Sequence, residues 1–123
     1  MVETTKIAIV DDDQEIREAI TTLVETVGLR AEGFSSAEEF LSSPRAQDST
    51  CLLLDVRMPG MSGLELQRQL VAVNWRIPII FVTAYADEDV RVRALAAGAV
   101  DVLSKPCLEE DLLRAIQTAL TQA

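Results

Sequence analysis

The sequence predicts an α/β fold in which five parallel β-strands alternate with α-helices that cover both faces of the sheet. The first observation behind this prediction is a series of short apolar runs, each ending at a polar or turn residue. The second is that apolar residues at helical spacing follow each run. At 123 residues, of which 49% are hydrophobic, the chain has the size of one domain, and we assign residues 1–123 to it.

The five expected strands are short segments, and most of them are continuously apolar, as is typical of buried strands. They cover residues 6–10, 29–34, 51–54, 79–82 and 100–104. The second of these is weak. Pro78 directly precedes the fourth, at a position where a missing backbone donor is tolerated.

Helix boundaries are indicated by capping residues between these strands. The first helix is expected to end at Gly28, which supplies a left-handed cap. Capping boxes at Ser36–Glu39 and Ser62–Glu65 open the second and third helices, and Asp87 caps the fourth. The last helix is indicated by apolar spacing alone, at Leu112, Leu113, Ile116 and Leu120. Residues 42–50, which include Pro44, are expected to form a loop.

Regular alternation of strand and helix predicts a parallel sheet with right-handed crossovers. As a fold-level inference, we expect the flavodoxin-like strand order 2-1-3-4-5, in which the first and third strands are neighbours. Open α/β sheets bind ligands beyond the carboxyl ends of their strands. Asp11 and Asp12 follow the first strand and Asp55 follows the third, so the three carboxylates are expected to converge at this edge.

Composition excludes several classes of function. The net charge of -9 disfavours unaided binding to nucleic acid or to an anionic membrane. The absence of histidine excludes Ser-His-Asp and Cys-His catalysis, imidazole metal ligands and a phosphohistidine on the chain itself. No apolar stretch has transmembrane length and no signal peptide is evident, so we expect a cytoplasmic protein. Cys51 and Cys107 are therefore expected to remain thiols that fill space.

Three converging carboxylates require a counter-charge, because two of them about 5 Å apart repel by about 3 kcal/mol at an effective dielectric of about 20. Mg²⁺ supplies that charge and prefers oxygen ligands. Asp11 and Asp12 are the expected metal side of the site, and the backbone carbonyl of Arg57 is a further candidate ligand. For Asp13 alone, capping of the first helix is the favoured role.

Lys105 and Thr83 end two other strands and are candidates for the same site. An ammonium at a buried strand end favours a carboxylate or phosphate partner, and Lys105 has that position. Pro106 follows it, and the sequence leaves the isomer of the Lys105–Pro106 bond open. Thr83 is weaker evidence because threonine is common in strands.

The whole chain resembles the receiver domain of two-component response regulators. The resemblance rests on motifs in one order at the expected strand ends: Asp11-Asp12, Asp55, Met58-Pro59-Gly60-Met61-Ser62-Gly63, Thr83-Ala84, Gly98-Ala99 and Lys105-Pro106. Two stretches are most similar to FixJ-like and NtrC-like receivers, Arg57-Met58-Pro59 and Gly98-Ala99-Val100-Asp101.

The resemblance implies that Asp55 accepts a phosphoryl group from a sensor histidine kinase and becomes an aspartyl phosphate. It also implies a site in which Mg²⁺ is held by Asp11, Asp55 and the Arg57 carbonyl, with Asp12 acting through water. Lys105 and Thr83 would bind the transferred oxygens, so that positioning and charge provide the catalysis. Such a domain catalyses only its own phosphorylation and dephosphorylation and is not an enzyme in the ordinary sense.

The resemblance further implies a switch that alters the surface of the fourth helix, fifth strand and fifth helix. This surface would regulate an output, with a transcription-factor effector domain outside these residues and a phosphorylation-dependent homodimer as a candidate assembly. The chain departs from the family at Val102, where an aromatic residue usually moves, and at Cys107, where Phe often follows Lys-Pro. The aromatic part of the switch is absent or relocated to Tyr85. Arg57 and Tyr85 stand at positions where the family tunes phosphoryl lifetime.

Three other functions are compatible with parts of the sequence. A haloacid-dehalogenase-like phosphatase also uses a strand-end Asp and Mg²⁺, but it usually has a second Asp where this chain has Arg57, and it needs room for a cap domain. A pseudo-receiver would bind partners without taking phosphate. Val102 keeps this reading open, but it is opposed by the presence of Asp11, Asp12, Asp55, Thr83 and Lys105. The third is a receiver that works without an effector domain.

Overall fold

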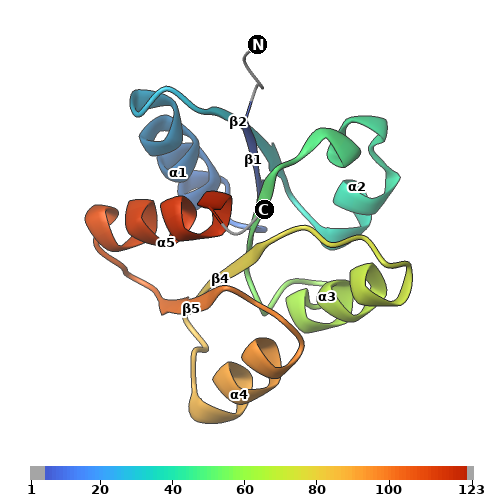
Figure 1. Cartoon of the computed structure of the whole chain (residues 1–123). Helices are drawn as coiled ribbons and strands as arrows, with labels where there is room; N and C mark the ends of the chain where they lie inside the picture. The colour runs from blue at the N-terminus through green and yellow to red at the C-terminus, as the bar shows by residue number, and fades with distance from the viewer. Residues whose placement is uncertain (1–4, 122–123) are drawn as a thin grey trace.

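The computed structural model describes residues 5–121 and has five parallel strands in one sheet (Figure 1). The strands are β1 (Lys6–Val10), β2 (Arg30–Phe34), β3 (Cys51–Leu54), β4 (Ile79–Thr83) and β5 (Asp101–Ser104). Their order, β2-β1-β3-β4-β5, confirms the predicted flavodoxin-like topology, and all four pairings are parallel. The two ends of the predicted domain, 1–4 and 122–123, lie outside the described residues.

Five α-helices connect and follow the strands. They are α1 (Gln14–Thr26), α2 (Ala37–Ser42), α3 (Gly63–Ala72), α4 (Glu88–Ala96) and α5 (Glu109–Thr121). One prediction was incomplete, because the expected loop at 42–50 contains a 3₁₀ helix, η1 (Pro44–Asp48). Its physical basis is local: Ser43 caps it, and Pro44 has its φ preset for a first helical turn.

The strand residues supply two apolar layers because successive side chains of a strand point to opposite faces. Ile7 and Ile9 of β1 pack with α1 and α5, whereas Ala8 and Val10 pack with α2, α3 and α4. Figure 1 shows α1 and α5 on one side of the sheet and the other three helices across from them. Because both faces are covered, the three central strands β1, β3 and β4 are buried along their whole length and are not alternately apolar and polar.

The predicted helix caps are confirmed with one correction. The side chains of Asp13, Ser36, Ser62 and Asp87 each accept a hydrogen bond from the first turn of the helix that follows. Ser62 and Glu65 form a complete capping box. The box predicted for α2 is wrong in its second half, because the Glu39 carboxylate accepts from the backbone N–H and hydroxyl of Ser35 instead of the N–H of Ser36.

The sequence also led to expectations about the two cysteines and about membrane-spanning segments. Both cysteines are unpaired, and burial raises the pKa of the Cys51 thiol to about 12, so this thiol stays protonated and serves as packing. Within residues 5–121, no helix has both the length and the apolar character needed to cross a membrane.

A buried ion pair joins β1 to β2 at the end of the sheet where the strands begin. The Lys6 ammonium, with 3% of its side chain exposed, donates to Glu32 at 2.9 Å and to the Arg45 carbonyl at 2.7 Å. Arg45 also contacts Glu32, at 2.7 Å. Burial opposes the charge on Glu32, but Lys6 outweighs it and holds the pKa of that carboxyl below its ordinary value.

Glu32→Gln is therefore expected to lower the free energy of unfolding at pH 7 by about 2 kcal/mol, because it leaves the buried Lys6 without a counter-charge. A lowered pKa stabilises the fold above the ordinary value of 4.5, and this contribution is lost as the pH falls through the folded pKa. Urea unfolding between pH 3 and pH 7 would measure both effects. The matched control is Glu110→Gln, because Glu110 is exposed. An equal loss of unfolding free energy in both variants would contradict the role given to Lys6.

Candidate functional site

Three of the predicted site residues each extend a strand by one further hydrogen bond. The backbone N–H of Asp11 donates to Phe34 at 3.1 Å, that of Asp55 to Val10 at 3.0 Å, and that of Lys105 to Thr83 at 2.9 Å. Each residue is thus the last one held in the sheet before the chain turns away. Because all strands are parallel, the three side chains arrive at the same carboxyl edge of the sheet, from the neighbouring strands β1 and β3 and from β5, which β4 separates from β3.

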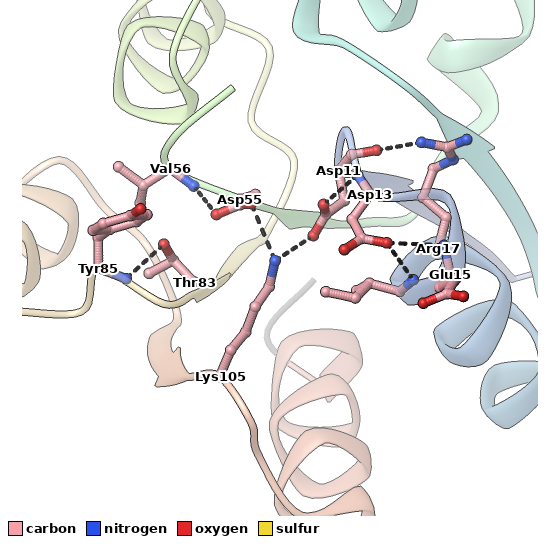
Figure 2. A network of polar contacts seen from close by, with 10 residues as sticks. Asp11, Asp13, Glu15, Arg17, Asp55, Val56, Thr83, Tyr85 and Lys105 are labelled. Atoms are coloured by element: carbon pink, nitrogen blue, oxygen red, sulfur yellow. Dashed lines mark hydrogen bonds and ion pairs between the residues drawn. The ribbon is translucent and has the colours of Figure 1, made fainter. Parts of the chain in front are cut away.

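An ammonium bridges two carboxylates at this edge. Lys105 Nζ lies 2.7 Å from Asp11 Oδ2 and 3.1 Å from Asp55 Oδ2 (Figure 2). Burial raises the pKa of Asp11 above its ordinary value, although the Lys105 hydrogen bond acts in the opposite direction. Burial also opposes the Lys105 charge, but its hydrogen bonds to Asp11 and Asp55 outweigh this and raise its pKa. The site therefore keeps Lys105 charged.

The second oxygen of each buried carboxylate is held by the backbone. Asp11 Oδ1 accepts from the N–H of Asp13 at 2.9 Å, and Asp55 Oδ1 accepts from the N–H of Val56 at 2.7 Å. Both carboxylates are therefore fixed in orientation before any ligand binds. The Lys105–Pro106 peptide bond that follows the bridging lysine is cis, which answers the question the sequence left open.

A group of three carboxylates that could hold a metal ion is present, as the sequence predicted. Oxygens of Asp11, Asp12 and Asp55 all lie within 4.8 Å of one another. Two of these residues are buried and Asp12 is exposed, so the group opens toward solvent. Hard oxygen donors with an open side fit Mg²⁺, which binds one or two carboxylates and keeps its other positions for water and phosphate.

Thr83 is the last residue of β4, and Arg57 lies in the loop after β3. Thr83 is fully buried, and its hydroxyl accepts from the N–H of Tyr85 at 3.1 Å. The guanidinium of Arg57 stacks on the Tyr85 ring, 4.2 Å from its centroid, and thereby joins the loop after β3 to the loop after β4. Val102, at the position of the missing aromatic, is buried among the α2–α4 layer.

Two residues that support the loop after Asp55 were not recognised from the sequence. The Glu38 carboxylate of α2 accepts from the backbone N–H of Met61 at 2.8 Å. The N–H of Gly63 donates to the Val56 carbonyl at 2.8 Å, and a Cβ on Gly63 would overlap the main-chain oxygen of Asp55. The glycine of the Met58–Gly63 motif was the available signal for the second contact. Glu38 is 23 residues from its partner and gave no signal.

The fold and the site together define a class: an open flavodoxin-like α/β domain with an acidic, lysine-bridged group at the carboxyl edge of its sheet. The family model described as the response regulator receiver domain matches residues 7–117, and the chain belongs to that family. Its role is therefore in signalling, as a phosphoryl-accepting switch, and not in metabolism.

Similar proteins agree with this assignment and with the predicted FixJ-like branch. The response regulator protein TmoT of Ectopseudomonas mendocina is 50% identical over 117 residues, which are 95% of this chain and 53% of TmoT. Nodulation protein W of Bradyrhizobium diazoefficiens is 46% identical over 111 residues, which are 90% of this chain and 49% of that protein. The chain thus spans about half the length of the curated relatives it matches.

Two solved structures extend the comparison to the backbone. The response regulator StyR superposes with a TM-score of 0.89 at 44% identity, covering 97% of this chain and 60% of StyR. FixJ-N superposes with a TM-score of 0.87 at 34% identity, covering 99% of this chain and 98% of FixJ-N.

Proposed function

We propose that Asp55 is the residue that accepts the phosphoryl group, and that a sensor histidine kinase is the donor. The observation that carries the proposal is the geometry of its carboxylate, which is buried, bridged to Asp11 by Lys105 and grouped with Asp12. In this setting the Asp55 carboxylate is a nucleophile held next to the Lys105 ammonium and beside two carboxylates that could hold Mg²⁺.

In the proposed reaction, an oxygen of Asp55 attacks the phosphorus of the phosphohistidine. The phosphorus–nitrogen bond breaks, and the imidazole nitrogen keeps the electron pair. The Val56 N–H and the Lys105 ammonium hold the attacking carboxylate in one orientation, which removes part of the entropic barrier. Water later attacks the phosphorus, and cleavage of its bond to Asp55 restores the carboxylate.

Charge on the transferred oxygens must be balanced during this reaction. Lys105 would exchange its contact with Asp55 for a phosphoryl oxygen while keeping Asp11, and the Thr83 hydroxyl would turn toward the same group. Bound Mg²⁺, held by Asp11, Asp12, Asp55 and the Arg57 carbonyl, would supply the remaining positive charge. The Thr83 hydroxyl would then no longer accept the hydrogen bond from the Tyr85 N–H, so phosphorylation would change the conformation of the loop after β4.

The output of the switch is proposed to lie on the surface formed by α4, β5 and α5. Since the relatives are about twice as long, we expect a transcription-factor effector domain in the whole protein and a homodimer formed on phosphorylation. Val102 stands where the family has an aromatic residue, so we propose that Tyr85 provides the moving ring. Its side chain is half-exposed, and its ring stacks on the guanidinium of Arg57. The net charge of -9 leaves DNA contact to another domain.

The test is incubation with acetyl phosphate, with Mg²⁺ or with EDTA, followed by intact mass measurement. We expect a Mg²⁺-dependent gain of one phosphoryl group that decays over time. Absence of any gain, with a cognate kinase as well, would favour the pseudo-receiver. Multiple turnover of unrelated phosphate esters would instead favour the phosphatase.

Asp12→Ala is expected to weaken Mg²⁺ binding by about tenfold or more, since it removes a full charge worth at least about 1.4 kcal/mol near the ion. Isothermal titration calorimetry would measure the dissociation constant. Asp13→Asn is the matched control, because it also removes one charge from the loop but retains a good helix cap. Equal weakening in both variants would mean that general charge, and not ligation by Asp12, sets the affinity.

A further inference from the structure

Arg17 of α1 contacts the acidic loop from the side opposite Lys105. Its guanidinium donates from Nη1 to the main-chain carbonyl oxygen of Asp11 at 2.7 Å. Figure 2 shows the side chain reaching back from the first turns of α1 to this oxygen, while the Asp11 carboxylate faces Lys105. Asp11 is therefore held at its side chain by one cation and at its backbone by another.

The path of the Arg17 side chain is set by the sheet. Its stem crosses β2 at Gly33, where an added Cβ would lie 3.4 Å from Arg17 Cδ. Arg17 is half-buried there. The arginine stem thus packs against β2 on its way to Asp11, at a spacing that an ordinary Cβ would also allow. The planar guanidinium is pre-organised for hydrogen bonding, so it loses less freedom per bond than a lysine ammonium does.

The Asp11 carbonyl matters because of its place in the chain. The N–H of Asp11 makes its hydrogen bond to Phe34 as the last member of the β1–β2 ladder. The carbonyl belongs to the next peptide, which is planar and includes the N–H of Asp12. Fixing this oxygen therefore fixes the direction in which Asp12 leaves the sheet.

We propose that Arg17 is a positioning residue for the cation site, which holds the Asp11–Asp12 peptide so that both carboxylates face Asp55. The inference rests on the proposed Mg²⁺ site and adds to it a residue outside the predicted ligand set. Partners that orient metal ligands in this way typically change metal affinity by about tenfold or more when they are removed.

The direction in which Mg²⁺ affinity changes on removal of Arg17 distinguishes positioning from simple charge repulsion. Arg17 is a cation near a cation site, so by Coulomb's law alone its removal would tighten Mg²⁺ binding. A positioning role predicts the opposite, because the freed peptide would let Asp12 move away from Asp11 and Asp55. The direction of the change in affinity thus separates the two effects.

Arg91 offers a matched control within the same chain. It is also half-buried, and its Nη1 donates to a main-chain carbonyl, that of Val102, at the same 2.7 Å. Arg91→Met therefore removes the same type of bond and the same charge from α4, away from the three carboxylates. Its effect on Mg²⁺ affinity reports only the loss of charge and of general stability.

The experiment is calorimetric titration of Mg²⁺ into the wild type, Arg17→Met, Arg17→Lys and Arg91→Met, with thermal unfolding of each protein in EDTA. We expect Arg17→Met to bind Mg²⁺ about tenfold more weakly, Arg17→Lys to lie between it and the wild type, and Arg91→Met to bind like the wild type. Unfolding midpoints in EDTA are expected to fall by similar amounts for Arg17→Met and Arg91→Met.

Two outcomes would overturn the proposal. Unchanged or tighter binding by Arg17→Met would show that Arg17 acts through stability or charge alone; if that variant does not fold, wild-type affinity in Arg17→Lys has the same meaning. A wild type that binds no Mg²⁺ would overturn the cation site itself, and this inference with it. The first outcome leaves the proposed function intact, and the second does not.

Discussion

Asp55→Asn is expected to abolish labelling by acetyl phosphate while leaving the fold unchanged. The amide has the same shape as the carboxylate and can still accept from the Val56 N–H, so the local backbone is preserved. It is not a nucleophile, however, and phosphorylation requires one. Replacing Asp55 also removes one of three neighbouring negative charges, so we expect equal or higher stability without Mg²⁺. Intact mass and urea unfolding measure the two expectations.

The control for this variant is Asp13→Asn, which also replaces an aspartate at the carboxyl edge of the sheet. Asp13 caps α1 and lies outside the group of three carboxylates, so labelling of this variant is expected to continue. Peptide mapping of the labelled wild type should locate the phosphoryl group in the peptide that contains Asp55. Labelling of Asp55→Asn at another carboxylate would reject the assignment of the acceptor.

Most of the fold was predictable from the sequence because its signals are local. Apolar runs such as Cys51–Leu54 mark buried strands, and Asp11, Asp55 and Lys105 are each the first residue after a strand. Asp55 and Lys105 could therefore be assigned to one edge of the sheet from chain order alone. The topology needed a general rule for α/β sheets, since no local pattern states which strands are neighbours.

The supporting contacts of the site could not be predicted in the same way. Arg17 and Glu38 act through long side chains on main-chain atoms, and any residue supplies a main-chain oxygen or N–H. No residue type at the receiving position indicates the contact. The error at Glu39 has a related cause, because its carboxylate reaches one residue further back than the capping pattern implies.

The lysine bridge has a consequence for switching. Lys105 pairs with Asp11 and Asp55 at once and offsets one of their two negative charges, so the ammonium already occupies the place between the carboxylates. A phosphoryl group on Asp55 brings additional negative charge and competes for the same ammonium. Since Lys105 follows β5 directly, any movement of its side chain is linked to the strand that carries Val102.

Gly63→Ala is expected to lower the free energy of unfolding by about 3 kcal/mol and to reduce phosphorylation at the same time. Two effects compete at this position. Alanine is the better helix former by about 1 kcal/mol, which would favour the variant at the start of α3. Its Cβ, however, would overlap the Asp55 carbonyl oxygen and lie 2.9 Å from the carbonyl carbon and 3.1 Å from Val56 Cα. These are backbone atoms that cannot rotate away, so the steric cost prevails.

Gly28→Ala separates this steric effect from the general cost of replacing a glycine. Gly28 has a φ of +88°, but an added Cβ there would meet no atom within 4 Å, so only backbone strain of about 1–2 kcal/mol is expected. Phosphorylation of Gly28→Ala should remain at the wild-type rate, because the residue lies at the far end of α1 from Asp13. In Gly63→Ala the helix must shift away from β3, and the displaced peptide is the one that carries the nucleophile. A variant at Gly63 that loses stability but is phosphorylated at the wild-type rate would show that α3 alone absorbs the overlap and that Asp55 is positioned by the sheet without help from the loop.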